Sequence, residues 1–291
     1  MDVKLQRVLV TGLEGFTGFY MQKELETAGF ETYGLDQVNL LDSKALRARV
    51  AEVRPHKLIH LAAIASVEAN DMDMLYRVNL VGTRNLLELI FLEAPDIQTL
   101  LLASSANIYG NAQTDKPLDE KTPPQPTNDY AVSKLAMEYI ARLWFDRLPI
   151  LITRPFNYTG VRQKETLLLP KIVRHFREGK KQIELGNLDV SRDFSDVRDL
   201  VNAYRRLIEV PSIPSGETVN ICSGIQYSLR EILSLMEEIS GYSIEAKSNP
   251  EFVRAREVQS LLGSNALLQK FIGPWKSRPL HETLKWMYDC S

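Results

Sequence analysis

The chain is poor in cysteine and histidine. Only Cys222 and Cys290 are cysteines among its 291 residues, and only four residues are histidines. The two cysteines have neither the C-x-x-C spacing of a redox site nor a zinc-ligand spacing. A small domain held by disulfides is therefore not indicated. We expect no bound metal, free thiols and a reducing, cytoplasmic setting.

The chain also lacks a charge excess and long apolar runs. Its net charge is −2, from 35 basic and 37 acidic residues, which disfavours nucleic acid or an anionic membrane as the main partner. Apolar stretches such as 100–104 are far too short to cross a bilayer. The first residues, 1–6, lead directly into a strand and show no secretory signal. We expect a soluble protein in which a few arginines can still hold an anionic small molecule.

The first half of the chain alternates short apolar runs with segments of helical period. Strands are predicted at 7–10, 31–35, 57–61, 99–103 and 149–153, and helices at 15–28, 43–54, 72–91 and 133–145. Continuous apolar strands separated by helices are typical of a parallel sheet covered on both faces. The sequence therefore predicts a doubly wound α/β fold.

A glycine-rich turn links the first predicted strand to the first helix. Residues 11–18 read Thr-Gly-Leu-Glu-Gly-Phe-Thr-Gly, so Gly12, Gly15 and Gly18 have the spacing G-x-x-G-x-x-G. Such glycines permit a tight turn and let backbone N–H groups and a helix N-terminus approach a pyrophosphate. Asp36, at the end of the second strand, can accept hydrogen bonds from a ribose and repel a 2′-phosphate. The pattern predicts a Rossmann dinucleotide site that favours NAD(H), with NADP(H) left open.

The regular alternation weakens after residue 154. Residues 161–165 and 186–194 resemble loops, whereas 167–178 and 229–240 have helical periodicity, and the segment 117–127 with four prolines is a long loop. We expect residues 1–155, with some later strands interleaved, to form the dinucleotide-binding domain. Residues 156–291 would mainly form a smaller C-terminal lobe that binds substrate.

Three residues have the spacing of an acid/base set. Tyr130 and Lys134 lie at i and i+4 at the start of a predicted helix and so share one face. A tyrosine has an ordinary pKa of about 10, and a nearby ammonium and a nicotinamide charge would favour its phenolate. Ser105, just after a strand, can hydrogen-bond the same substrate oxygen. Y-x-x-x-K alone is common on surfaces, but behind a dinucleotide turn it predicts hydride transfer on an alcohol or ketone; His60 is more simply a packed strand residue.

These motifs together resemble the extended short-chain dehydrogenase/reductase family of nucleotide-sugar epimerases, dehydratases and reductases. The resemblance covers nearly the whole chain and rests on segments 11–18, 60–63, 79–83, 104–106, 130–134 and 154–157. It implies that Ser105, Tyr130 and Lys134 are catalytic. It also implies cofactor contacts from Gly12, Gly15, Phe16, Gly18, Asp36, Leu61, Ala62, Ala63, Asn79, Tyr130 and Lys134. Family members often pair through the helices at 72–91 and 133–145, so a homodimer is expected, with Leu86, Leu89, Ile90, Leu135, Ile140 and Leu143 as candidate contacts.

Later segments resemble the branch that acts on GDP-mannose and GDP-4-keto-6-deoxymannose. They are 186–189, 192–199, 220–224, 254–258 and 262–265, with Ala255 standing where that branch usually has proline. Arg192 and Arg254 suit a diphosphate because a guanidinium offers paired donors. Glu257 can accept from a guanine edge or a ribose, and Asn157 can donate to a phosphate or sugar oxygen. Surface ion pairs and loop caps are the alternative roles for these residues.

The residues after Ser105 bear on the reaction. A 4,6-dehydratase needs a further acid/base, and in that family acidic side chains follow the catalytic serine or threonine. Ala106 and Asn107 cannot exchange protons here. The sequence therefore favours reduction of a 4-keto group, with GDP-4-keto-6-deoxy-D-mannose giving GDP-D-rhamnose as the leading reaction. A C4 epimerase, a reductase of the dTDP pathway and a non-catalytic NAD(P) sensor are alternatives.

Overall fold

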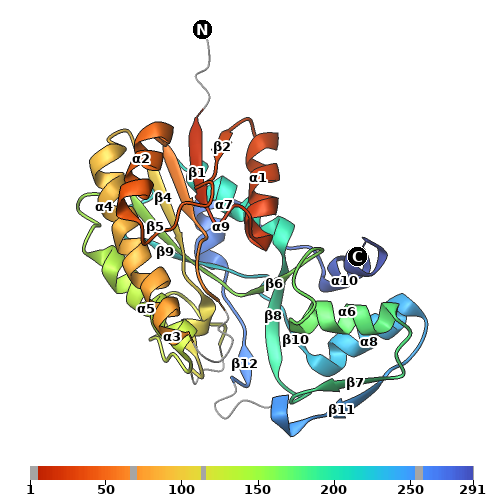
Figure 1. Ribbon diagram of the computed structural model, residues 1–291. Helices are drawn as coiled ribbons and strands as arrows, with labels where there is room; N and C mark the ends of the chain where they lie inside the picture. The colour runs from red at the N-terminus through yellow and green to blue at the C-terminus, as the bar shows by residue number, and fades with distance from the viewer. Residues whose placement is uncertain (1–5, 66–70, 113–115, 253–257, 291) are drawn as a thin grey trace.

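A six-stranded parallel sheet forms the centre of the larger part of the molecule. The computed structural model describes residues 6–65, 71–112, 116–252 and 258–290 (Figure 1). The strands are β1 (Arg7–Thr11), β2 (Glu31–Tyr33), β3 (Lys57–His60), β4 (Thr99–Ala103), β5 (Ile150–Pro155) and β9 (Thr218–Ile221). Their order is β2-β1-β3-β4-β5-β9, and every neighbouring pair is parallel. The predicted doubly wound sheet is confirmed.

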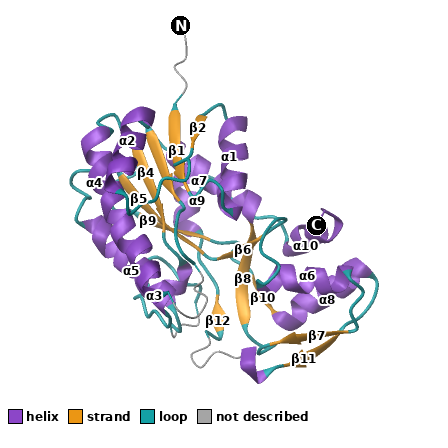
Figure 2. Ribbon diagram, viewed as in Figure 1, coloured by secondary structure: helices purple, strands orange, loops and turns teal. Residues whose placement is uncertain are grey.

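Helices cover both faces of this sheet (Figure 2). On one face lie α2 (Ser43–Val53), α4 (Thr83–Glu93) and α5 (Asp129–Arg142), and on the other lie α1 (Phe16–Thr27), α7 (Val197–Glu209) and α9 (Ala266–Ile272). Because side chains alternate along a strand, β4 sends Leu100 and Leu102 into the first core and Leu101 into the second. Each such fully buried leucine stabilises the fold by about 1.5–3 kcal/mol, which is why these strands are apolar throughout.

The C-terminal residues build a second, smaller part with its own core. Strand β8 (Ser191–Asp196) pairs with β6 (Asn157–Thr159), β10 (Gln226–Ser228) and β12 (Ser260–Leu261), and β7 (Gln182–Leu185) pairs with β11 (Glu245–Ser248). Around them pack α6 (Leu168–Arg177), α8 (Leu229–Ser240) and α10 (Leu280–Cys290). In Figure 1 this part lies beside the carboxyl ends of the large sheet. Since α7, β9 and α9 return to the large sheet, the chain passes repeatedly between the two parts.

The remaining described helices are short. They are α3 (Met72–Tyr76), the π-helix η1 (Arg77–Gly82) and the 3₁₀ turns η2 (Ala106–Tyr109) and η3 (Pro250–Phe252). The helix predicted at 72–91 is thus continuous in the chain but contains a π-helical section. Within the described residues, no helix is both long enough and apolar enough to cross a membrane.

One predicted helix and one predicted loop differ clearly from the structure, and the strand predicted at 31–35 ends early, at Tyr33. Helix α5 begins at Asp129 rather than Ser133, because Asn128 caps it: its Oδ1 accepts from the N–H of Ala131 at 2.9 Å. Asparagine is a preferred N-cap for this reason. The loop predicted at 186–194 is wrong in its second half, where β8 begins at Ser191. This strand is polar, and its pairing with three strands distant in sequence stabilises it.

Candidate active site

The dinucleotide turn lies where the strand order reverses. Strand β1 is flanked by β2 on one side and β3 on the other, and ligands of such sheets bind at the carboxyl ends of the strands at this position. The backbone beyond β3 is fastened to the end of β1: the N–H of Leu61 donates to Thr11 O at 3.2 Å and that of Ala62 to Thr11 Oγ1 at 3.1 Å. The turn and the segment 61–63 therefore share one edge of the site.

The turn has the shape that a dinucleotide requires. Gly12 has φ +74°, and a Cβ there would lie 3.0 Å from the backbone N of Ala62. At Gly18 a Cβ would lie 2.3 Å from Gly12 O, so neither position accepts a side chain. Helix α1 starts directly after Gly15, with no acidic residue in its first turn. Bare backbone and the positive helix end thus face one anion-binding position, and the residues present fit a nicotinamide dinucleotide.

Ser105 and Tyr130 come together beyond β4. Ser105 is 7% exposed and caps η2, where its Oγ accepts from the N–H of Asn107 at 3.1 Å. Its hydroxyl lies close enough to the Tyr130 side chain to favour the charged form of that side chain. Burial raises the pKa of Tyr130, and the nearby Ser105 hydroxyl lowers it by less. The expected shift toward phenolate is therefore not what the protein itself produces. A tyrosine that keeps its proton suits a proton donor.

Lys134 lies one turn after Tyr130 and is buried, with 3% exposure. Its Nζ donates to Ala103 O at 2.7 Å. Burial lowers the pKa of Lys134 to about 8, and the carboxylate of Glu138 acts in the opposite direction. Glu138 in turn forms a buried ion pair with Arg154, at 2.7 and 3.0 Å. Sequence reasoning did not identify Glu138, although its i, i+4 spacing from Lys134 was a usable signal.

The π-helical section positions Asn79 between the segment that follows β3 and the catalytic helix. Asn79 is 1% exposed; its Nδ2 donates to Ile64 O and to Ser133 Oγ, both at 3.0 Å, and its Oδ1 accepts from the N–H of Ile64 at 2.9 Å. Ser133 Oγ donates to Tyr130 O at 2.8 Å. Since π-helical turns often occur at functional sites, this one links the segment beyond β3 to the catalytic helix. Direct contact between Asn79 and a cofactor remains a prediction.

His60 connects the glycine turn to this section. Its Nδ1 lies 2.7 Å from Thr11 Oγ1 and its Nε2 lies 2.9 Å from Thr83 Oγ1. Thr83 Oγ1 donates to Asn79 O at 2.8 Å, so it accepts from Nε2–H, and Nδ1 accepts from Thr11. Burial, with a smaller effect of Lys134, lowers the pKa of His60 to about 3. His60 is a neutral, buried strand residue, as its sequence position indicated.

Comparison with known proteins agrees with this geometry. Residues 8–222 match the model of the NAD dependent epimerase/dehydratase family. The chain belongs to that family. It is 36% identical over 274 residues to GDP-6-deoxy-D-talose 4-dehydrogenase of Aggregatibacter actinomycetemcomitans, covering 92% of this chain and 91% of the relative. It is likewise 36% identical over 286 residues to GDP-6-deoxy-D-mannose reductase of Pseudomonas aeruginosa, with 93% and 92% covered.

A solved structure extends the likeness to the whole fold. The structure of RMD from Pseudomonas aeruginosa complexed with NADPH has a TM-score of 0.86 and 33% sequence identity to this chain, covering 98% of this chain and 97% of that one. As an epimerase/dehydratase family member, the chain is an NAD(P)-dependent enzyme of nucleotide-sugar chemistry.

Two predicted cofactor residues have partners that the sequence did not indicate. Asp36 does not close β2, which ends at Tyr33; it stands in a turn with φ +53° and forms an ion pair with Arg49 at 2.6 Å. Phe16 stacks on Tyr158 with ring centroids 6.1 Å apart. The hydroxyl of Tyr158 lies 2.9 Å from Thr17 Oγ1, so β6 of the smaller part contacts the glycine turn directly.

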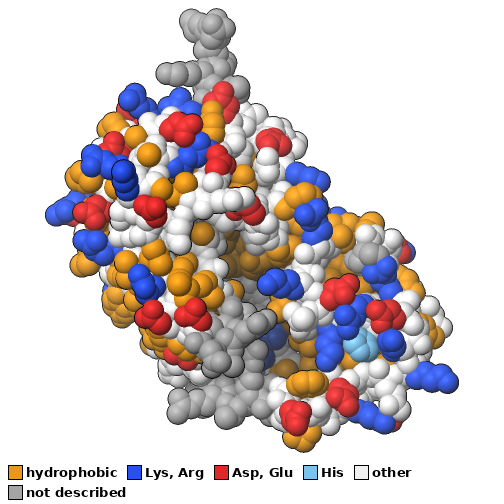
Figure 3. All heavy atoms as spheres, viewed as in Figure 1, with side chains coloured by type: hydrophobic (Ala, Val, Ile, Leu, Met, Phe, Trp, Pro, Cys, Tyr) orange, Lys and Arg blue, Asp and Glu red, His pale blue; other side chains and the backbone are white. Residues whose placement is uncertain are grey.

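Two of the predicted substrate residues, Arg192 and Asn157, lie on the paired strands β8 and β6. Arg192 Nη1 donates to Ser191 O at 2.9 Å, and Asn157 Nδ2 lies 3.5 Å from Asp193 O. The buried Asp193 carboxylate accepts from the N–H and hydroxyl of Ser223, at 2.9 and 2.6 Å. Arg254 and Glu257 lie outside the described residues. Figure 3 shows the molecule hollowed between its two parts, where β6 and the glycine turn meet.

Proposed function

We propose that this enzyme reduces the 4-keto group of a GDP-6-deoxyhexulose. The observation that carries the proposal is that the Ser105 hydroxyl lies close to the Tyr130 side chain beside a dinucleotide turn, with Lys134 one helical turn away. The two relatives named for GDP-6-deoxyhexoses support the substrate class. The leading reaction is conversion of GDP-4-keto-6-deoxy-D-mannose to GDP-D-rhamnose.

The three side chains divide the work at the carbonyl oxygen. A bound nicotinamide supplies the hydride that reduces the carbonyl carbon. Ser105 Oγ accepts from Asn107 N–H, and its own hydrogen would turn from Tyr130 to the carbonyl oxygen and polarise it. Tyr130 donates its proton to the oxygen as negative charge develops there. The buried Lys134 ammonium, one helical turn after Tyr130, would stabilise the phenolate that remains and bind the cofactor ribose.

Two positions, the residue after Ser105 and the carboxylate on the catalytic helix, disfavour dehydration. Ala106, the residue after Ser105, is 1% exposed and has no ionisable group. Glu138, a carboxylate on the catalytic helix, is bound in the ion pair with Arg154. A C5 proton acceptor is therefore not supplied by either position.

The sugars in the names of the two relatives differ in configuration at C4, because 6-deoxytalose and 6-deoxymannose are C4 epimers. Both are 36% identical to this chain, so identity does not select between them. The configuration depends on which face of the ketone the sugar presents to the cofactor. The proposed substrate contacts are Asn157 and Arg192, with Arg254 and Glu257.

The test is oxidation of NADH and NADPH with freshly prepared GDP-4-keto-6-deoxymannose, with the product identified by NMR. Tyr130→Phe is expected to lower kcat at least about 100-fold, the lower range for a general acid, while cofactor binding is retained. If NMR shows a product with the 6-deoxytalose configuration, the proposed stereochemistry of the product is wrong but the proposed reduction stands. Turnover of a GDP-sugar without net cofactor oxidation would replace reduction by epimerisation.

We further propose NAD(H) as the preferred cofactor, because the Asp36 carboxylate would repel a 2′-phosphate.

We also propose a homodimer. Leu86, Leu89 and Ile90 are buried in the core of the chain, so the expectation that they contact a second copy is wrong. Leu143 is 72% exposed. Seven of the ten exposed large hydrophobic side chains among the described residues lie on or next to α3, η1, α4 and α5, and Figure 3 shows hydrophobic side chains gathered on this side. They are Met72, Val81, Phe91, Leu92, Val132, Tyr139 and Leu143.

A further inference from the structure

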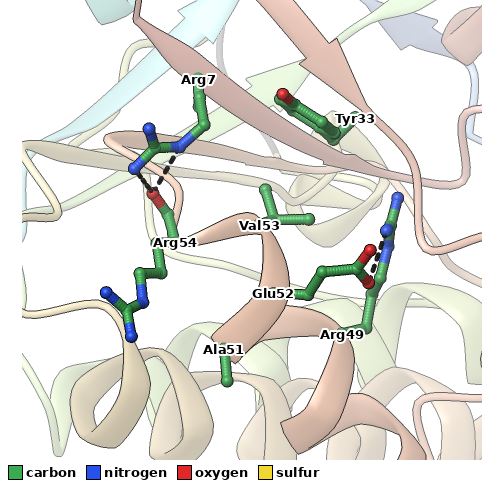
Figure 4. Close-up of a pocket in the computed structure, with 7 residues that line it drawn as sticks. All are labelled: Arg7, Tyr33, Arg49, Ala51, Glu52, Val53 and Arg54. Atoms are coloured by element: carbon green, nitrogen blue, oxygen red, sulfur yellow. Dashed lines mark hydrogen bonds and ion pairs between the residues drawn. The ribbon is translucent and has the colours of Figure 1, made fainter.

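Arg154 forms a buried ion pair with a carboxylate of the catalytic helix. Its Nε and Nη2 donate to the two oxygens of Glu138, at 3.0 and 2.7 Å, and the two side chains are only 6% and 4% exposed. The Arg49–Glu52 pair, which Figure 4 shows at the edge of an open recess, is different because Glu52 is 69% exposed. Water and salt screen an exposed charge but screen a buried one much less. The charge of Glu138 therefore acts strongly on the groups next to it.

The guanidinium of Arg154 is fixed by further hydrogen bonds. Its Nη1 donates to the hydroxyl of Tyr109 at 2.9 Å and to Glu120 O at 3.2 Å. The Tyr109 hydroxyl donates in turn to Asn220 Oδ1 at 2.7 Å. These partners come from η2, from a loop and from β9. The guanidinium, and the carboxylate that it binds at two points, are therefore held in one position.

Lys134 is the catalytic group beside this carboxylate. It precedes Glu138 by four residues on α5, so both side chains lie on one face of the helix, and both residues are 3% exposed. The Lys134 Nζ donates to Ala103 O at 2.7 Å, an acceptor without a full charge. A buried ammonium that lacks a counter-charge tends to lose its proton.

Two other titratable groups near Lys134 carry no negative charge. Tyr130, one helical turn earlier, keeps its proton because burial raises its pKa. His60, on β3, is neutral, since burial and, to a smaller extent, Lys134 lower its pKa to about 3. Glu138 is the carboxylate that acts on Lys134, and it raises the pKa of that lysine against the larger effect of burial.

We propose that Glu138, held in place by Arg154, is a positioning residue that keeps the buried Lys134 ammonium charged. Arg154 fixes the carboxylate, and the carboxylate supplies the counter-charge that Ala103 O and the neutral His60 do not. Ketone reduction then extends to a higher pH than Lys134 alone would allow. The inference deepens the proposed reduction and rests on it for a kinetic readout, but a second readout needs no substrate.

The test compares the wild type with the double variant Glu138→Met, Arg154→Met. Replacing both partners by apolar side chains leaves no buried charge unpaired, and such exchanges are often neutral for stability. Titration of Lys134 is followed by NMR of lysine labelled with ¹³C at Cε, its signal assigned by its loss in Lys134→Met, and kcat is measured over the same pH range. We expect both to shift down by about one pH unit, the lower range for the loss of an adjacent opposite charge. For that shift from a value near 8, kcat falls about fivefold at pH 8 and hardly at pH 6.

Tyr109→Phe is the matched control. It removes one hydrogen bond to Arg154 from the same buried network but leaves the ion pair and every charge in place, so Lys134 should titrate as in the wild type. An unshifted Lys134 in the double variant overturns the proposal, and so does an equal shift in Tyr109→Phe, because the Glu138 charge would then not be its cause.

A second variant covers the case in which the double variant does not fold. Glu138→Gln removes the charge but keeps the shape, and an unshifted Lys134 in that variant also overturns the proposal. If Lys134 shifts as expected but the wild type reduces no GDP-sugar ketone, the proposed reaction fails and the role of the ion pair stands.

Discussion

Two reactive side chains of the site, and the backbone of the third residue, are held by groups that take no part in the chemistry. Lys134 Nζ is bound to Ala103 O, Ser105 Oγ to the N–H of Asn107, and the backbone of Tyr130 to Ser133. These partners hold the reactive groups in place before a substrate binds. Less conformational entropy is therefore lost on reaching the reactive arrangement.

The buried position of Lys134 predicts a pH limit on ketone reduction. Because burial lowers its pKa to about 8, the ammonium loses its proton as the pH rises through that value. Its stabilisation of the Tyr130 phenolate is then lost. We expect kcat to fall by about tenfold per pH unit above this pKa, measured from pH 6 to 10 at saturating cofactor. Lys134→Met should be slow at all pH values and show no break; a wild-type profile flat to pH 9.5 would contradict the assignment.

His60 predicts how stability depends on pH. The unfolded histidine titrates near 6.5 but the folded one near 3, so below pH 6.5 the unfolded state binds the extra proton. This contributes a decrease in the free energy of unfolding of up to about 1.4 kcal/mol per pH unit as the pH falls. His60→Gln is expected to be less stable at pH 7.5 but to show a shallower decline from pH 6.5 to 5 in urea titrations. Equal slopes for the two proteins would refute this.

At the residue scale, the sequence predicts what local spacing determines. Tyr130 and Lys134 follow from i, i+4 geometry, and Ser105 from its place after an apolar strand. The Asp36–Arg49 pair does not follow, because a positive-φ turn brings together two residues from different elements. No spacing rule specifies that turn.

At the scale of elements, the π-helical section η1 gives Asn79 its role. The wider turn places one buried amide between the segment beyond β3 and the catalytic helix α5. The hydrophobic pattern predicted a helix over 72–91, and it could not predict this section, because the same apolar face is compatible with either helix. Likewise β8 was missed because its stability comes from strands distant in sequence.

The variant Asn79→Ala tests whether the Asn79 amide in η1 secures the site. It leaves both backbone groups of Ile64 without their side-chain partner, and each buried unpaired group costs about 1–3 kcal/mol. We expect a loss of about 2–4 kcal/mol in urea unfolding and weaker cofactor binding. Asn85→Ala is the control on α4: its single bond to Leu40 O is 3.2 Å long and partly exposed. A loss no larger than that of Asn85→Ala would show that the amide does not secure the site.

At the scale of the whole molecule, the exposed apolar helices predict self-association. Leu143→Glu with Tyr139→Glu places charges among side chains that are 72% and 56% exposed in the single chain. We expect the dimer to shift to monomer in sedimentation velocity without loss of folding. Ile225→Glu is the control, since Ile225 is 53% exposed but lies before β10, in the smaller part. An unchanged dimer in the double variant would move the interface elsewhere.

Strand β9 is synthesised long after β5, the strand beside it in the sheet, and this affects folding during synthesis. Strand β5 ends at Pro155, but the strand that covers its outer edge is residues 218–221. At about 5–20 residues per second, a ribosome needs several seconds to make the intervening segment. During that interval the apolar edge of β5 has no neighbour on the nascent chain. A chaperone that shields strand edges would therefore be most useful just before the last quarter of the polypeptide emerges from the ribosome.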